Sequence, residues 1–556
     1  MVGKEVPPSA DGLTSADTTA SLARHTVVMS VGTALSRLTG LLRVVATAWA
    51  LGLTASRLAD AYNVANTTPN IVYDLVLGGV LSSTFVPVFV EWLESRGREA
   101  AWESARTVIT AVTVVLVLAC AAAMAAADPI IHLYTLHARP QGLAAYRALA
   151  VPFLLVFMPQ LIFYGLGAVW TALLNAHRRF AAPMFAPILN NVVAIAAMAA
   201  FAMLARGAHV TPATLSATER WVLAGGTTLG VIVMTVALLP ALRATGFRWR
   251  PALDLHDEAL RRIVRLSGWV LVYVLTTQLG YLVVIVLSNH LTGDYTVYSY
   301  AYIFFQLPFA VFVVSVFTAL LPAMSSRWVE RDLDGFRSLL SRGVRSMGFI
   351  ILPSALGTMA LAGPAVRLLF EHGRVTGVDT HLLAGTLVAF GIALLPFSAF
   401  QLFLRAFYAM QDTRTPALIN LGGTAIGAVA NVILYRYLGV EGLALGFAVT
   451  YAFGSVVAVA LLRRRLSRVD GRRITASLAR MLVAAAAAGA AALGVSSGLA
   501  AAFDGGRTLV ELAQVVLGVA AGVGAFGLLA MLLGVEELSM VTELAGIGYR
   551  GRHRAR

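Results

Sequence analysis

Two arginines, Arg37 and Arg43, lie inside a long apolar stretch near the start of the chain. A charge at the centre of a bilayer costs about 2.5 to 3.5 kcal/mol on insertion scales, so these side chains must face protein, water or an anion. Their spacing along a helix puts them on different faces, but both long side chains can reach one polyanion, and a guanidinium suits phosphate. We therefore predict an anion-binding cavity, with salt bridges or snorkelling toward the interface as the alternative.

A polar stripe runs along the next apolar stretch at steps of three and four residues, which is the spacing of one helical face. Such a face in a membrane helix is directed toward protein or a water-filled path, so we expect it to line the same substrate cavity. The alternative is that its asparagines only bond neighbouring helices and that its last acid neutralises an arginine. The members of the stripe are Asp60, Asn63, Asn66, Asn70 and Asp74.

Three further residues are expected to support this site. Gly40 lies between the two arginines and lets a helix or a substrate approach closely. Pro69 removes a backbone donor beside Asn70 and permits a bend at mid-membrane. Ser36 directly precedes Arg37 in the same segment.

The elements that must position these residues are membrane helices. The chain of 556 residues is 58% hydrophobic and 13% charged, with a mean hydropathy of +0.79. A soluble chain could not cover so much apolar surface. Fourteen apolar runs are long enough to span a bilayer, which predicts an all-α polytopic membrane protein.

The formal net charge of +14 raises the question of nucleic acid. With the N-terminus in the cytoplasm, however, most of the 42 Lys and Arg residues fall on the cytoplasmic side of the fourteen spans. This distribution follows the positive-inside rule and predicts both termini in the cytoplasm, in a bacterial inner membrane. The basic charge then sets the topology, and no nucleic-acid partner is expected. The polar first residues do not predict a cleavable signal peptide.

The sequence also predicts an internal repeat. Pro183 and Pro416 end similar loops 233 residues apart, and Pro87 and Pro322 end similar spans 235 residues apart. Six spans separate the equivalent elements, which predicts two pseudo-symmetric six-helix lobes facing a cavity, followed by two extra C-terminal helices. The expected parts are a cytoplasmic tail (1–27), an N-lobe (28–245), a cytoplasmic linker (246–263), a C-lobe (264–465), a two-helix appendage (466–534) and a basic cytoplasmic tail (535–556).

Enzymatic readings find little support in the sequence. Lys4 is the only lysine, which excludes a P-loop with its phosphate-binding lysine, and Cys120 is the only cysteine. No HExxH motif is present. We therefore expect no catalytic residue and no cofactor, and the sequence identifies no metal ligands.

Several of these segments together resemble the MurJ (MviN) family of lipid II flippases. The resemblance rests on the run from Ser36 to Arg43, Asp60-Ala61-Tyr62, Pro69-Asn70, Gly79 and Phe85-Val86-Pro87-Val88-Phe89. The later stretches from Leu174 to Pro187 and from Phe407 to Pro416 are similar to that family as well, so the resemblance covers roughly residues 28–465.

The resemblance implies the fold of the multidrug/oligosaccharidyl-lipid/polysaccharide (MOP) exporters, with a cationic cavity for the pyrophosphate and sugars of lipid II. It implies that Arg37 and Arg43 are the essential arginines of the first span, and that the last two helices form a groove for the polyprenyl tail. The chain departs from the family pattern at Tyr73-Asp74, Gly78-Gly79 and Ala301 to Phe304, which implies a cavity that lacks two of the family's arginines.

These observations predict a flippase that moves lipid II to the outer leaflet by alternating access, in contact with membrane lipids and with cell-wall synthesis proteins as further partners. The alternatives are an exporter of another polyprenyl-linked glycan or of a drug, and a non-transporting scaffold for cell-wall synthesis. We also consider that Asp74 holds the arginines in the empty carrier, or that it lies at a water-filled mouth without a specific role.

Overall fold

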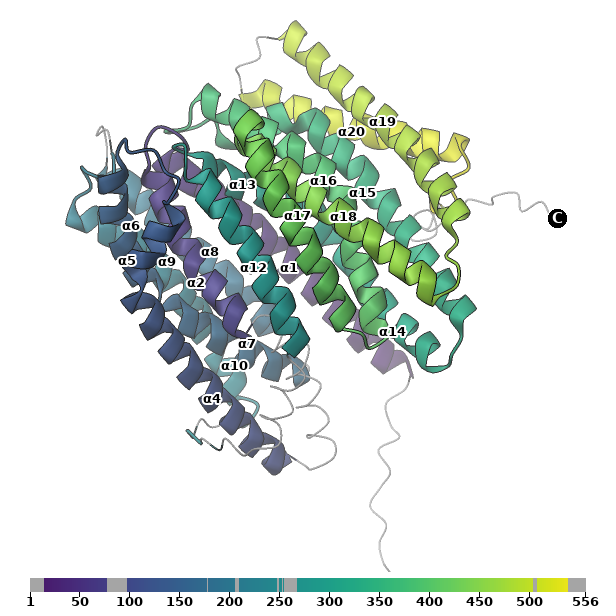
Figure 1. Cartoon of the computed structure of the whole chain (residues 1–556), viewed down its shortest axis with the longest axis horizontal. Helices are drawn as coiled ribbons and strands as arrows, with labels where there is room; N and C mark the ends of the chain where they lie inside the picture. The colour runs from purple at the N-terminus through teal and green to yellow at the C-terminus, as the bar shows by residue number, and fades with distance from the viewer. Residues whose placement is uncertain are drawn as a thin grey trace, which may run out of the picture.

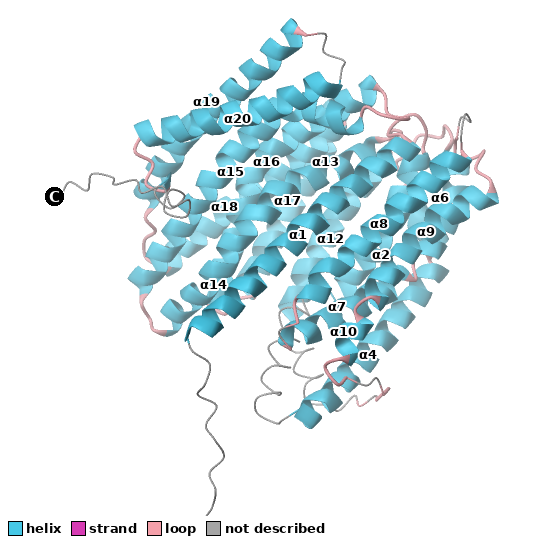
Figure 2. Ribbon diagram, turned by 180° about the vertical axis from the view of Figure 1, so that it is seen from behind, coloured by secondary structure: helices cyan, strands magenta, loops and turns pink. Residues whose placement is uncertain are grey.

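The computed structural model describes residues 15–77, 98–177, 179–205, 210–247, 250–252, 254, 268–503 and 508–538. The regular elements over these ranges are all helices. In a bilayer a helix satisfies every internal backbone hydrogen bond within its own segment, which is why so apolar a chain folds this way. The expected all-α polytopic fold is confirmed (Figures 1 and 2).

The helices of the first half of the chain are α1 (Ser15–Leu51), α2 (Leu58–Leu77), α4 (Arg98–Ala125), α5 (Ala127–Tyr134), α6 (Leu143–Phe157), α7 (Gln160–Ala176), α8 (Ala181–Leu204), α9 (Ala217–Val236) and α10 (Leu239–Arg243). Those of the second half are α12 (Gly268–Ser288), α13 (Asp294–Pro308), the π-helical turn η2 (Phe309–Val313), α14 (Val314–Val329), α15 (Leu333–Phe370), α16 (Gly377–Ala409), α17 (Arg414–Leu438), α18 (Val440–Arg465), α19 (Gly471–Ala502) and α20 (Thr508–Leu532).

Within the described residues, 13 helical stretches are long and apolar enough to cross a membrane, and each coincides with one of the fourteen expected spans. The remaining expected span, residues 62–90, is described only as far as Leu77, as α2. Its second half lies outside the described residues, with Gly78, Gly79 and Pro87. So do most of the predicted linker and both chain ends.

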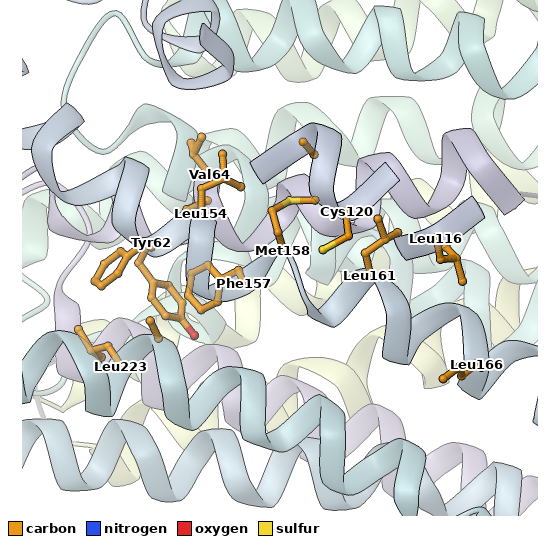
Figure 3. Close-up of a cluster of buried hydrophobic side chains, with 14 of the residues drawn as sticks. Tyr62, Val64, Leu116, Cys120, Leu154, Phe157, Met158, Leu161, Leu166 and Leu223 are labelled. Carbon is orange, nitrogen blue, oxygen red and sulfur yellow. The ribbon is translucent and has the colours of Figure 1, made fainter. Parts of the chain in front are cut away.

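A buried hydrophobic cluster joins α2 and α4 to α9 and forms the core of the N-lobe. Figure 3 shows part of it, where Tyr62 points toward Phe157 and Cys120 lies near Leu116. The rings of Tyr62 and Phe157 meet edge to face, with centroids 5.5 Å apart. This geometry is the favoured one for aromatic pairs and fixes the first half of α2 against α6.

A second cluster forms the core of the C-lobe, mainly from α13 to α18. Val44, Ala48 and Leu53, at the end of α1 and just after it, are buried in this cluster. The earlier part of the same helix packs on α8 of the N-lobe, where Gly32 lies close to Met184. Helix α1 therefore crosses from one lobe to the other. Arg43 lies at this crossing, and Arg37 lies just before it.

The internal repeat is visible in matching hydrogen bonds of the two lobes. In the N-lobe, the amide nitrogen of Asn191 on α8 donates to Ser36 O at 3.3 Å and to Thr39 Oγ1 at 3.0 Å on α1. In the C-lobe, the amide of Asn420 on α17 donates in the same way to α12, to Tyr273 O at 3.2 Å and Thr277 Oγ1 at 3.0 Å. Helices α1 and α8 thus correspond to α12 and α17, as the repeat predicts.

Helices α19 and α20 pack on each other and on α15, outside the two lobes (Figure 1). Arg345 of α15, 5% exposed, holds the segment after α20 through Glu536 at 2.9 Å and through the buried Glu537. Arg473 of α19 contacts the same Glu536 at 2.7 Å. At the other end of α15, Arg367 pairs with Glu511 of α20 at 3.2 Å. Ion pairs therefore fix the appendage to both ends of α15.

The Arg345→Ala variant is expected to lower the stability of the protein by about 3 to 5 kcal/mol, because Glu537 would be left as a buried charge without compensation. Thermal unfolding in detergent measures the loss. Arg342→Ala, one turn away and exposed, is the matched control. Equal unfolding midpoints for the two variants would contradict this role of Arg345.

The same cluster predicts a pH dependence. The hydrogen bond from Arg473 lowers the pKa of Glu536 below its ordinary 4.5. Because the pKa is depressed in the folded state, the stabilisation is fully present above pH 4.5 and is lost as the pH falls through the folded value.

Candidate functional site

Arg37 and Arg43 lie on α1 where it passes between the lobes. Arg37 is exposed and Arg43 is half-buried. Arg43 lies within electrostatic range of the hydroxyls of Tyr62 and Tyr164 of the N-lobe and Tyr300 of the C-lobe. Among the ion pairs of the described residues, none involves either arginine.

The two ends of the polar stripe of α2 lie in different surroundings. Asp60 and Asn63, at its first turns, bind the C-lobe directly. Asn70 and Asp74, further along the helix, line a cavity. Asn66 lies between these two parts, and its buried Oδ1 has no hydrogen-bond partner among the described residues.

Asp60 caps the start of α13 in the opposite lobe. Its carboxylate is fully buried and accepts from Gly293 N at 2.6 Å, Thr296 N at 3.1 Å and Thr296 Oγ1 at 2.7 Å. A carboxylate at a helix N-terminus satisfies free amide groups and complements the helix dipole. The structure thus places Asp60 in a bond between the lobes and not on the wall of the cavity, which differs from the expectation that the whole stripe lines it.

Arg57 is a second link between the lobes that the sequence analysis missed. Its buried guanidinium donates to Gln141 O at 3.3 Å and Arg139 O at 3.4 Å in the N-lobe, and to Asn289 O at 3.2 Å in the C-lobe. It also lies over the ring of Tyr146, 5.8 Å from the centroid. The sequence shows this arginine one turn before the polar stripe. It lies between two expected spans, however, where charged residues are common and do not indicate burial.

Gly293 permits the close approach of the lobes at this point. Its φ is +91°, a conformation that L side chains rarely adopt, and a Cβ atom there would lie 2.6 Å from Thr54 Cγ2. Thr54 itself donates its backbone N–H to Asp379 Oδ1 at 3.2 Å, at the start of α16. The loop between α1 and α2 is therefore held against two helix starts of the C-lobe.

These contacts obey the symmetry of the chain. The bonds of Arg57 to His290, Asp60 to Gly293 and Asn63 to Thr296 each join residues 233 positions apart. This is the spacing of the proline repeat. Equivalent elements meet each other only at a two-fold axis, so α2 and α13 face each other across the axis that relates the lobes.

Asp74 lies deeper, in a cavity of about 340 Å³ between α2 and the helices α12, α13, α17 and α18. Its Oδ2 accepts from Gln278 Nε2 at 3.0 Å. Among the described residues it forms no ion pair, so in this conformation it is held by a neutral amide and not by Arg37 or Arg43. Neither arginine belongs to the cavity wall.

A larger groove of about 600 Å³ lies beside α15, against α19, α20 and η2. Its walls are almost entirely apolar, with Ser354 and Thr358 as the hydroxyl side chains, and with Phe304, Phe349 and Phe526 among the aromatic ones. A groove of this composition accepts a hydrocarbon chain. Over the described residues, no three His, Cys, Asp or Glu side chains gather closely enough to hold a metal ion.

The sequence model of the family described as "Lipid II flippase MurJ" matches residues 48–513. The chain belongs to this family. Lipid II flippase MurJ of Burkholderia cenocepacia is 27% identical over 450 residues, covering 80% of this chain and 84% of that relative. The probable lipid II flippase MurJ of Vibrio cholerae is 30% identical over 453 residues, covering 80% and 83%. The MurJ match begins after Arg37 and Arg43, so it does not test them.

Solved structures agree on the MurJ fold. A structure of lipid II flippase MurJ in an inward closed conformation superposes with a TM-score of 0.68 at 21% identity, covering 91% of this chain and 99% of the other. An inward-facing multidrug MATE transporter of the MOP superfamily superposes with a TM-score of 0.63 at 15% identity, covering 77% and 94%. The MOP exporter fold implied by the MurJ resemblance is confirmed.

Proposed function

We propose that this chain moves lipid II from the inner to the outer leaflet of the bacterial inner membrane by alternating access, without making or breaking a covalent bond. One observation supports the mechanism: among the described residues, apart from the Asp74–Gln278 and Thr67–Tyr295 contacts, the hydrogen bonds between the lobes gather at one end. By the charge distribution this is the exterior end. The structure then corresponds to a carrier closed to the outside.

Different parts of the described site suit different parts of the substrate. The arginines of α1, which lack acidic partners among the described residues, take the pyrophosphate. The apolar groove beside α15 takes the polyprenyl tail, which stays in contact with lipid. Opening to the outside requires the bonds of Arg57, Asp60 and Thr54 to break. Each such bond contributes only about 0.5 to 3 kcal/mol net, so substrate binding can shift this equilibrium.

Depletion of the protein in cells tests which lipid it transports. If lipid II is the cargo, depletion of the protein makes lipid II accumulate in the inner leaflet while later cell-wall polymers decline. Accumulation of a different polyprenyl-linked glycan would reassign the cargo. Normal levels of every lipid-linked precursor would instead favour the non-transporting scaffold.

The orientation is a separate prediction, because every statement about the closed end depends on it. Both termini are expected in the cytoplasm, since the positive-inside rule places most basic loops there. Reporter fusions in the loops on that side should report cytoplasm, at Arg179, Arg250, Arg331 and Arg468. Fusions near Arg139 and Asp294 should report the exterior, and one inverted reporter would contradict this topology.

A further inference from the structure

The cavity that contains Asp74 has an unusual wall for a carrier of a pyrophosphate lipid. Four tyrosines and four carboxamide side chains line it, and Asp74 is the one charged group among the described residues of its wall. The tyrosines are Tyr281, Tyr298, Tyr302 and Tyr451. The carboxamides are Asn70, Gln278, Asn420 and Asn431. From this chemistry we infer that the cavity is a subsite for a sugar ring of the transported headgroup, separate from the pyrophosphate site; the inference rests on the proposed function.

The aromatic side chains form a continuous cluster in which one pair of rings is parallel and the next rings are tilted against it. The rings of Tyr298 and Tyr302 are stacked, with centroids 6.4 Å apart and planes 5° apart. Tyr302 then meets Phe447 at 5.7 Å, and Phe447 meets Tyr451 at 4.6 Å. Aromatic faces present a large, rigid apolar area at little cost in side-chain entropy. The C–H face of a sugar ring is a flat apolar surface of the kind that packs on such rings.

Hydrogen-bonding groups are fixed around this cluster. The amides of Gln278 and Asn420 are held by their nitrogen atoms, to Asp74 at 3.0 Å and to Thr277 at 3.0 Å, which leaves their carbonyl oxygens as acceptors. The hydroxyls of Tyr298, Tyr451 and Thr424 have no hydrogen-bond partner in the part of the chain that the structure describes. Neutral donors and acceptors on an apolar wall match the hydroxyl and acetamido groups of a sugar.

The size and charge of the cavity argue against the other parts of the substrate. Its volume of about 340 Å³ is near the lower end for ligand cavities, which suits one sugar ring and not a whole headgroup. A pyrophosphate would face Asp74 without a cation among the described residues of the wall, so repulsion directs it to the arginines of α1. A polyprenyl chain would leave the polar groups without partners.

Binding to the full chain in lipid nanodiscs tests the subsite, with lipid II and a polyprenyl pyrophosphate that carries no sugar as the two probes. The triple variant Tyr298→Phe, Tyr451→Phe, Thr424→Val removes three hydroxyls with almost no change in volume. It is expected to weaken lipid II binding by about 100-fold, since each of the three lost hydrogen bonds costs about 5-fold, and to leave the sugar-free lipid unaffected. Tyr408→Phe, outside the cavity, is the matched control.

The outcomes separate this inference from the proposed function. If the triple variant binds both lipids as the wild type does, the sugar subsite is wrong and the flippase proposal stands. If the wild-type protein binds neither lipid, the proposed function itself fails. If Asp74→Asn abolishes lipid II binding and the triple variant does not, the cavity recognises a cationic group, and the sugar assignment is overturned.

Discussion

Replacement of Arg37 or Arg43 by alanine is expected to abolish lipid II flipping while the protein still folds and inserts. Each guanidinium makes charge-assisted hydrogen bonds to phosphate worth about 1.5 to 3 kcal/mol, so each variant should lose about 10- to 100-fold in affinity for a pyrophosphate lipid. Insertion should not suffer, because a charge that is costly in the membrane has been removed. Binding in nanodiscs and complementation of a depleted strain measure the two effects.

Two further variants control this result. Lysine at Arg37 or Arg43 should rescue poorly, because it keeps the charge and loses the paired donors of the guanidinium. Arg436→Ala, exposed at the end of α17, removes a positive charge away from the site and should leave flipping intact. Alanine variants of Arg37 and Arg43 that complement as well as Arg436→Ala would refute the anion site.

The second large effect concerns the end of the molecule at which α2 and α13 join the lobes. A disulfide between cysteines introduced at Asn63 and Thr296, whose side chains meet at 3.3 Å, would hold α2 and α13 together. Alternating access requires these helices to separate, so oxidation is expected to stop transport almost completely and reduction to restore it. Replacement of Cys120, the only native cysteine, gives the necessary background.

The matched control is a cross-link that stays within one lobe. Thr211 and Thr214 lie in a loop of the N-lobe, with hydroxyl oxygens 3.2 Å apart, and cysteines there should leave transport unchanged on oxidation. Each single cysteine must also transport normally. Full turnover by the oxidised Asn63–Thr296 pair would show that the lobes do not separate at this end.

The membrane helices could be predicted from the sequence because the bilayer selects long apolar segments directly. The 233-residue repeat was also readable, since Pro183 and Pro416 mark equivalent loops. The hydrogen-bond partners of individual polar residues could not be predicted from the sequence. Asp60 and Asn63 share a helical face with Asn70, but the C-lobe binds the first turns of that face directly and leaves a cavity beside Asn70. This difference depends on how two lobes meet that lie more than 200 residues apart in the chain.

Asp74 illustrates the same limit. An acid near two membrane arginines is reasonably paired with one of them from sequence alone, because an isolated buried charge is expensive. In the structure Gln278 of α12 is closer and supplies a neutral donor, since α2 turns Asp74 toward the C-lobe. Arg57 was overlooked for the opposite reason: a loop arginine carries no signal of burial until the folded chain closes over it.

Transport by the purified protein tests the central claim most directly. Lipid II is incorporated into both leaflets of proteoliposomes, and an enzyme added outside converts only the headgroups that it can reach. The account predicts that vesicles with the wild-type protein expose the inner-leaflet pool over time, and that vesicles with Arg37→Ala or Arg43→Ala do not. Conversion that stops at the outer-leaflet pool in wild-type vesicles, as in protein-free ones, would contradict it.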